Sequence, residues 1–289
     1  MVTNDDGIDS EGLRQLAVAM AELGDVTVVA PDDEYSGAGA SLGALHRMQP
    51  EVHRAAMGAV AEAWAVSGPP ALCVMFARLG AFGPPFDLVV SGINPGANVG
   101  RSVYHSGTVG AAVTARAGGV TGIAVSQAVK GYGIEGQGWD EMLSGMRWSA
   151  AAEVAAAVVG ALIESPAPAP VAVNVNVPNR DVADMAGWER TMVGRVPPRV
   201  ISGAVLEPKV GHPGTFRVAM QWGDAVSLPA GTDGGAIERD LVSLTLLGSL
   251  TDRASQRQHD TGPADPDEHA AGVIGLALDR LFAQVLPRR

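Results

Sequence analysis

The sequence predicts an α/β fold in which a mostly parallel β-sheet is covered by helices on both faces. In the first half of the chain, short β-branched runs alternate with segments whose apolar residues recur at helical spacing. These runs are largely apolar, which is typical of strands buried on both faces of a parallel sheet. Apolar residues make up 47% of the 289 residues, enough for one large core.

The alternation can be followed element by element. A first strand at the N-terminus leads directly into Asn4-Asp5-Asp6-Gly7. A helix is expected over 13–23, which Asp9 or Ser10 can cap and Gly24 can close. The elements expected next are a strand at 26–30, a helix at 69–79, a strand at 87–91, a helix at 107–117, a strand at 121–126, a helix at 148–164 and a strand at 171–177.

The character of the sequence changes after Pro178. Closely spaced turn residues separate short alternating runs over 185–230, which indicates an antiparallel hairpin region. We expect a loose polar connection over 252–269, followed by an amphipathic helix over 270–285. Two glycine-rich patches are expected to be surface loops, at 131–138 and 231–235.

Composition argues against several classes of function. The chain carries 31 acidic and 20 basic residues, a net charge of −11, which argues against a nucleic-acid duplex or an anionic membrane as partner. Its single cysteine, Cys73, excludes an intrachain disulfide and a multi-cysteine zinc site. The longest apolar stretch is about half the length of a membrane span, and the N-terminus lacks the features of a signal peptide. We therefore expect a cytoplasmic protein.

Polar residues that suit a metal ion follow three of the expected strands. Asp5 and Asp6 come directly after the first strand, Ser36 follows the second, and Asn94 follows the strand at 87–91. Ligands of open α/β sheets bind at the carboxyl ends of strands, and two adjacent carboxylates repel each other unless a cation compensates. Carboxylate, hydroxyl and amide oxygens favour Mg²⁺ or Mn²⁺ over zinc. The alternative is a polar turn in which an aspartate caps the helix.

A phosphate-binding segment is predicted at the start of the helix over 107–117. Ser106, Gly107 and Thr108 place two hydroxyls beside the free N–H groups of a helix N-terminus. Asn98 lies shortly before them in the chain, at the same sheet edge. The alternative for Ser106 and Thr108 is an ordinary helix cap.

Two other motifs carry weaker hypotheses. Ser41 lies in a G-x-S-x-G pattern, but the preceding segment is a polar loop, whereas a serine-hydrolase elbow requires a strand there. His105 adjoins the expected phosphate segment, and a structural role is the simpler interpretation of it.

The order of these motifs resembles the SurE survival-protein family. The matching segments are Val2-Thr3-Asn4-Asp5-Asp6-Gly7-Ile8, Val29-Ala30-Pro31-Asp32, Ser36-Gly37, Val66-Ser67-Gly68-Pro69-Pro70, Val90-Ser91-Gly92-Ile93-Asn94-Pro95-Gly96-Ala97-Asn98-Val99-Gly100, Tyr104-His105-Ser106-Gly107-Thr108-Val109-Gly110-Ala111-Ala112, Asn174-Val175-Asn176-Val177-Pro178, Thr232-Asp233 and Val242-Ser243-Leu244-Thr245.

The resemblance implies a divalent-metal-dependent nucleotidase that hydrolyses nucleoside 5′- and 3′-monophosphates, and in some members short polyphosphate. It implies a Rossmann-like three-layer core over residues 1–180. A projecting β-hairpin and a C-terminal helix over 181–289 would pack partly on the core and form a homodimer or homotetramer. By matching motifs, one Mg²⁺ or Mn²⁺ per subunit would be held by Asp5, Asp6, Ser36 and Asn94, with Asp5 and Asp6 catalytic. The implied phosphate and substrate residues are Asn98, Ser106, Gly107 and Thr108.

Three departures from the family pattern bear on activity. Pro69 stands where the family has a threonine, the segment 131–145 looks longer than usual, and the aspartate and histidine expected after Thr245 are missing. The alternative function is therefore a non-catalytic nucleotide- or metal-binding protein that keeps the fold.

Overall fold

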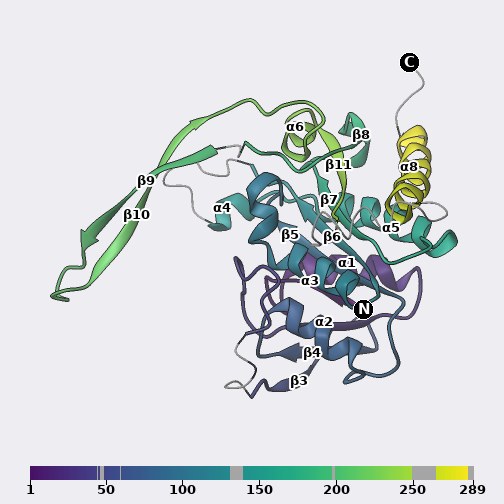
Figure 1. Cartoon of the computed structure of the whole chain (residues 1–289), viewed down its shortest axis with the longest axis horizontal. Helices are drawn as coiled ribbons and strands as arrows, with labels where there is room; N and C mark the ends of the chain where they lie inside the picture. Colours follow the sequence, from purple (N-terminus) through teal and green to yellow (C-terminus); the bar gives the residue numbers. More distant parts are fainter. Residues whose placement is uncertain are drawn as a thin grey trace, which may run out of the picture.

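The structure is a computed structural model that describes residues 1–43, 45, 49–58, 60–130, 139–196, 199–248 and 265–285. At the centre of this described part lies a nine-stranded sheet with strand order β3-β4-β2-β1-β5-β6-β7-β11-β8 (Figure 1). Its strands are β1 (Val2–Thr3), β2 (Thr27–Pro31), β3 (Val52–Ala55), β4 (Glu62–Val66), β5 (Leu88–Pro95), β6 (Thr121–Gln127), β7 (Ala172–Val177), β8 (Gly187–Arg190) and β11 (Leu241–Leu246).

Most neighbours in this sheet are parallel, which confirms the predicted fold class. The run from β4 through β2, β1, β5 and β6 to β7 is parallel throughout. Antiparallel pairing occurs towards the two edges, where β3 pairs with β4 and β11 pairs with β7. Strands β8 and β11 come from the region after residue 180, so this region extends the same sheet.

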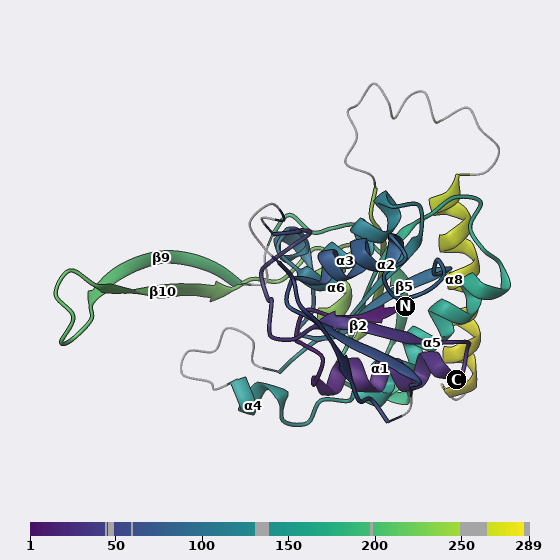
Figure 2. The ribbon, with the colours of Figure 1, turned by 90° about the horizontal axis from the view of Figure 1, so that it is seen from below.

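Helices form a layer on each side of the sheet (Figure 2). One layer contains α1 and α5, whose buried apolar residues join those of α8 in a single core cluster with the strands. The other contains α2 and α3, which bury a second apolar cluster against β2 and β5. The helices are α1 (Glu11–Ala21), α2 (Pro70–Arg78), α3 (Gly107–Ala117), α4 (Trp139–Leu143), α5 (Trp148–Glu164), α6 (Asp233–Glu238) and α8 (Pro266–Val285), with 3₁₀ turns η1 (Gly100–Tyr104) and η2 (Val182–Asp184).

The region over 185–230 contains the predicted hairpin. Strands β9 (Arg199–Pro208) and β10 (Phe216–Ala225) pair antiparallel and form a separate two-stranded ribbon. Figures 1 and 2 show the ribbon projecting well away from the three-layer body. The remainder of that region supplies β8 to the central sheet.

Several sequence-based expectations need correction or refinement. The glycine-rich patch at 231–235 is not a surface loop, because residues 233–235 are buried and begin α6. A Cβ on Gly235 would lie 2.1 Å from the carbonyl oxygen of Pro229, so this glycine allows close packing. The last helix begins at Pro266, within the stretch expected to be a loose connection. The patch at 131–138 and most of the expected connection, residues 252–264, lie outside the described residues.

The first helix shows how its cap and packing arise from sequence. Of the two proposed caps, Ser10 is the one used, because its side chain accepts a hydrogen bond from the backbone N–H of Leu13. Residue 12 in the first turn is a glycine that lies directly against β5. An ideal Cβ there would lie 2.0 Å from the carbonyl oxygen of Ile93, so α1 can approach the sheet this closely only with glycine.

No helix within the described residues is both long and apolar enough to span a bilayer.

We predict that Gly12→Ala destabilises the fold. The added methyl group must push α1 away from β5, and overpacking of this kind costs about 1–3 kcal/mol. Gly160→Ala in α5 is the matched control, because nothing lies within 4 Å of its Cβ position. The free energy of unfolding of that control should increase by up to about 1 kcal/mol, because alanine has a higher helix propensity than glycine. Urea unfolding of both variants measures the difference, and equal free energies of unfolding would contradict the packing described here.

Candidate functional site

The candidate site lies where the strand order reverses. From β1 the chain continues to its neighbour β2 on one side, and it later enters β5 on the other side and proceeds to β6 and β7. The carboxyl ends of β1, β2 and β5 therefore meet at one edge, where open α/β sheets bind ligands. These three ends carry Asp5 and Asp6, Ser36, and Asn94 respectively.

Asp5 is a buried carboxylate at the N-terminus of α3. Its Oδ1 accepts a short hydrogen bond from the hydroxyl of Thr108. A Cβ on Gly107 would lie 2.8 Å from Oδ2 of Asp5, so the carboxylate packs directly against the first residue of the helix. Burial raises the pKa of Asp5, and hydrogen bonds from Thr108 and Gly107 oppose that increase.

Asp6 has no comparable partner. Its buried Oδ2 atom makes no hydrogen bond in the described structure. Burial, followed by the charges of Asp5 and Glu34, raises the pKa of Asp6 to about 8. Two neighbouring, largely buried carboxylates thus lie together, and no positively charged side chain in the described part of the chain compensates them. This charge balance and the oxygen donors fit a hard divalent cation.

Ser36 is brought close to the carboxylate pair by the backbone. The N–H of Tyr35 donates to the carbonyl oxygen of Asp5 over 2.7 Å, which fixes the loop after β2 beside the end of β1. Ser36 is the next residue and lies in an exposed turn. Its hydroxyl is therefore accessible near the pair.

Asn94 lies at the end of β5, beyond an irregularity in the β5–β6 pairing between Ser91 and Asn94. Gly92 permits this bulge, because its φ is +140° and a Cβ would lie 2.3 Å from the carbonyl oxygen of Val125. The Nδ2 atom of Asn94 donates to the carbonyl oxygen of Gly96 over 2.6 Å. This bond leaves the Oδ1 atom of Asn94 for a ligand.

The proposed phosphate residues also come together, although their hydroxyls already have internal partners. Ser106 caps α3 by accepting the N–H of Val109 over 3.1 Å, as the simpler interpretation expected. The hydroxyl of Thr108 donates to Asp5. The start of α3 is thus adjacent to the carboxylate pair, so a phosphate held by its N–H groups would lie next to a cation held by Asp5 and Asp6.

Asn98 is fixed by residues that were not among the predicted site residues. The backbone N–H of Asn98 donates to Oδ1 of Asn176 over 2.7 Å, and its carbonyl oxygen accepts bonds from Nδ2 of Asn176 and of Asn174. Its side chain donates to the hydroxyl of Ser126 over 2.9 Å. Two asparagines at alternate positions of an apolar strand were the signal in the sequence, because buried amides need partners.

Other candidate residues gain no support. The segment before Ser41 is a loop, so the serine-hydrolase elbow is absent there. The carbonyl oxygen of His105 accepts the N–H of Gly39, which is a backbone role. Among the described residues, no three His, Cys, Asp or Glu side chains gather in a possible metal site. A metal at Asp5 and Asp6 would therefore need neutral oxygens such as those of Ser36 and Asn94.

Of the departures from the family pattern, the structure describes Pro69 but not the residues that follow the last matched motif. Pro69 is the N-cap of α2 and makes no side-chain hydrogen bond to that helix. Residues 249–264, which follow the last matched motif, lie outside the described part.

Comparison with known proteins decides the family. The family model described as "Survival protein SurE" matches residues 1–198. The chain belongs to the SurE family. The crystal structure of the SurE protein from Aquifex aeolicus is similar in fold, with a TM-score of 0.68 and 28% sequence identity. That similarity covers 90% of this chain and 97% of the Aquifex chain. Membership of the SurE family supports a general nucleotidase or phosphatase role.

We predict that Asp6→Asn stabilises the metal-free protein. The amide keeps the size of the side chain and removes the charge that burial and Asp5 disfavour. The pKa of Asp6 is about 8 in the folded state against an ordinary value of 3.8, so the folded state binds more protons between these values. The metal-free parent should therefore lose stability as the pH rises through this interval. Removing the unpaired buried charge in Asp6→Asn should raise the free energy of unfolding by about 1–3 kcal/mol.

Thermal melts of the parent and Asp6→Asn in EDTA, at about pH 5 and about pH 8, test this prediction. The increase in Tm of the variant over the parent should be larger at the higher pH. Tm should rise by about 2–4 °C for each kcal/mol gained in the free energy of unfolding. Asp9→Asn, an exposed neighbour, should leave Tm unchanged. A gain equal at both pH values, or none, would show that the charge of Asp6 does not strain the fold.

Proposed function

We propose that this SurE protein is a divalent-metal-dependent phosphomonoesterase that hydrolyses nucleoside 5′- and 3′-monophosphates. Short polyphosphate is a further candidate substrate. One observation carries the proposal: no positive charge among the described residues compensates the buried Asp5–Asp6 pair, and Asp5 packs against the N-terminus of α3. A cation site and an anion site would thereby be adjacent, which is the arrangement that a phosphate monoester requires.

In this proposal, Asp5, Asp6, Ser36 and Asn94 hold one Mg²⁺ or Mn²⁺ per subunit. Such an ion supplies positive charge that neutralises the phosphate and eases attack by an oxygen nucleophile. The hydroxyl of Thr108 orients the Asp5 carboxylate, because it donates to Oδ1. Asp5 is then suited either to attack phosphorus or to position a water molecule.

The remaining phosphate oxygens would be bound from the other side of the site. The N-terminus of α3 at Gly107 and Thr108 carries partial positive charge that favours an anion, and the N–H groups of these two residues already donate to Asp5. Ser106 fixes the start of that helix, and Asn98, whose Nδ2 atom donates one hydrogen bond to Ser126, would direct its second amide proton to the phosphate. These donors would stabilise the charge that shifts among the phosphate oxygens in the transition state.

We expect Asp5→Asn and Asp6→Asn each to lower kcat/KM for AMP by at least about 10²-fold, as loss of a preorganised charged group does. Asp9→Asn is the matched control, because it makes the same chemical change in the same loop at an exposed position. EDTA should abolish turnover and excess Mn²⁺ should restore it. Phosphate release, measured from 5′-AMP, 3′-AMP and nitrophenyl phosphate, provides the readout.

The same assay separates this function from its alternative. A non-catalytic nucleotide- or metal-binding protein would bind Mn²⁺ and AMP without releasing phosphate. Parent activity in the Asp6→Asn variant, with unchanged Mn²⁺ binding, would remove the assignment of the site.

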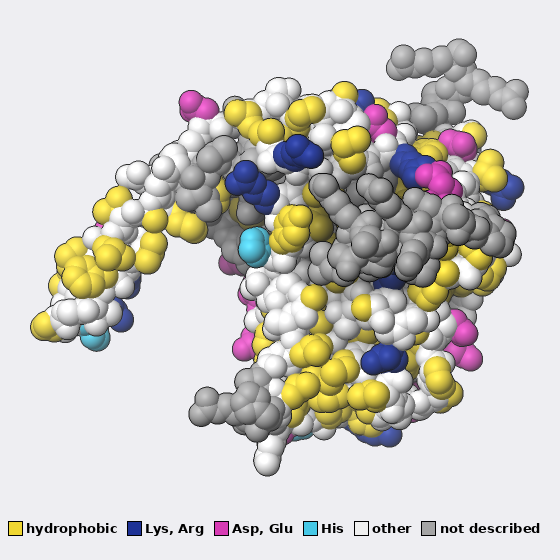
Figure 3. Space-filling model, viewed as in Figure 1, with side chains coloured by type: hydrophobic (Ala, Val, Ile, Leu, Met, Phe, Trp, Pro, Cys, Tyr) yellow, Lys and Arg dark blue, Asp and Glu magenta, His cyan; other side chains and the backbone are white. Residues whose placement is uncertain are grey.

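We also propose that the protein assembles as a homodimer or homotetramer. The β9–β10 register places Phe216, Val218 and Met220 opposite Pro208, Leu206 and Ala204, on one face of the ribbon. The side chains of Leu206 and Val218 are 63% and 62% exposed. Figure 3 shows hydrophobic side chains gathered along the projecting ribbon. An isolated two-stranded ribbon is only marginally stable, and a second copy of the chain would cover this face.

Light scattering should therefore give at least twice the 29.5 kDa mass of one chain. Val218→Asp places a charge on the apolar face and should lower that mass. The control Ala219→Asp changes the neighbouring residue, whose side chain points to the opposite face. A parent mass of one chain at micromolar concentration would rule out the assembly.

A further inference from the structure

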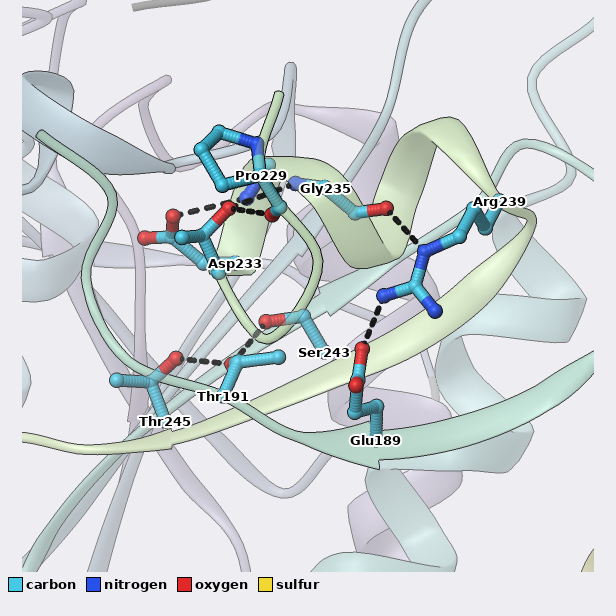
Figure 4. Close-up of polar contacts among 10 residues, drawn as sticks. Glu189, Thr191, Pro229, Asp233, Gly235, Arg239, Ser243 and Thr245 are labelled. Atoms are coloured by element: carbon cyan, nitrogen blue, oxygen red, sulfur yellow. Dashed lines mark hydrogen bonds and ion pairs between the residues drawn. The ribbon is translucent and has the colours of Figure 1, made fainter. Parts of the chain in front are cut away.

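Asp233 is a fully buried carboxylate that has no part in the proposed cation and phosphate sites. Its Oδ2 atom accepts the backbone N–H of Gly100 over 2.8 Å. Its Oδ1 atom accepts the N–H of Gly194 over 2.9 Å and that of Gly234 over 2.8 Å. The side chain itself is 0% exposed. Figure 4 shows Asp233 beside Pro229 and Gly235 at the start of α6.

These bonds join three segments that are far apart in the sequence. Gly100 begins η1, two residues after Asn98. Gly194 lies on the segment that leads into β9, and Asp233 follows the segment that returns from β10. The two hairpin legs are also tied by their backbones, because Met192 donates to Gly231 over 3.0 Å and accepts from Asp233 over 2.9 Å. We call this junction of residues 192–196 and 229–235 the hairpin root.

Packing at the hairpin root leaves little freedom. Gly100 has a φ of +57°, and a Cβ on it would lie 3.2 Å from the carbonyl oxygen of Gly194. A Cβ on Gly194 would in turn lie 3.1 Å from Oδ1 of Asp233. Charge-assisted hydrogen bonds to a carboxylate are about twice as strong as neutral ones. Asp233 therefore holds Gly100 firmly against the root.

Asn98 is thus set between two anchors. On the β7 side, the side chain of Asn176 binds the backbone N–H and carbonyl groups of Asn98. Asp233 fixes Gly100, two residues later, from the hairpin side. The intervening backbone cannot turn without breaking a buried bond at one anchor. The direction of the Asn98 side chain and the path of the chain towards Ser106 depend on both anchors.

We propose that Asp233 is a positioning residue for phosphate binding, acting through the segment from Asn98 to Ser106. The proposal rests on the proposed function, in which this segment contacts the phosphate of the substrate. Asp233 does not touch the substrate: it fixes the donors that do. Misplacing such groups by a small distance weakens binding and catalysis together.

Asp233→Asn tests the proposal against Glu238→Gln as a matched control. Asparagine has only one acceptor oxygen, so it cannot accept at both positions, and the Gly100 or the Gly194 contact is lost. Glu238 lies on the same helix and accepts the N–H of Leu228 through one oxygen, which glutamine can still provide. The control therefore makes the same chemical change without releasing the substrate segment.

Three readouts are measured on the full-length protein with Mn²⁺. For Asp233→Asn, KM for AMP and the inhibition constant of inorganic phosphate should both rise about 10- to 100-fold, the range expected for a lost hydrogen bond to a charged group. Binding of Mn²⁺ should not change, because Asp5, Asp6 and Ser36 are on other loops and Asn94 lies in β5, before the anchor between Asn98 and Asn176. Amide hydrogen exchange over residues 98–106 should accelerate. Glu238→Gln should match the parent in all three.

The outcomes separate this proposal from the proposed function. If the parent releases no phosphate, the proposed function fails, and hydrogen exchange over 98–106 still tests the anchoring. Unchanged exchange in Asp233→Asn overturns the proposal. So does a lower kcat with parent values of KM and phosphate inhibition, because that pattern reports a smaller folded fraction. If Asp233→Asn does not fold, Gly194→Ala presses a methyl group against Oδ1 of Asp233 and should produce the same pattern.

Discussion

The candidate site depends on the repulsion between two adjacent buried carboxylates, Asp5 and Asp6, at the end of β1. Asp5 and Asp6 are adjacent and largely buried, and burial raises the pKa of both carboxyl groups. Asp5 is compensated by the start of α3 and by the hydroxyl of Thr108, whereas the buried Oδ2 of Asp6 has no hydrogen-bond partner among the residues that the structure describes. A fold selected for stability alone would not retain two such charges side by side. A cation bound between Asp5 and Asp6 in the native protein would compensate both charges.

Polar contacts also fix the segments that carry the other candidate residues. Gly92 and the bulge in β5 bring Asn94 to the sheet edge, and the N–H of Tyr35 ties the Ser36 turn to Asp5. Asn174, Asn176 and Ser126 fix Asn98 from inside the sheet. These contacts are buried hydrogen bonds between segments distant in the chain, so they act together only in the folded state. If the proposed function holds, this preorganisation would avoid rearrangement of the site on binding the phosphate.

The sequence predicted the parallel core because its strands and helices carry strong periodic signals. The helix at 107–117 and the long helix at 148–164 were expected with the bounds they have. Four strands of the sheet were not predicted: β3 and β8 at its edges, and β4 and β11 inside it. In β3, exposed residues such as His53 and Arg54 give no apolar run. The helix α6 was mistaken for a loop, since its glycines serve tight packing against Pro229 and Leu228. For the site, residue types at strand ends predicted the loops that meet. The contacts of Asn176 and Asp233 depend on tertiary pairing, which no local sequence pattern specifies.

The central claim is that Asp5 and Asp6 form the core of a divalent-cation site. Isothermal titration of Mn²⁺ into the metal-free protein tests it most directly, with Asp6→Asn and the exposed Asp9→Asn compared under the same conditions. The account predicts one Mn²⁺ per chain in the parent and in Asp9→Asn, and an affinity at least about tenfold weaker in Asp6→Asn, as expected for the loss of a charged contact. Equal affinity in all three proteins, or no binding in the parent, would contradict it.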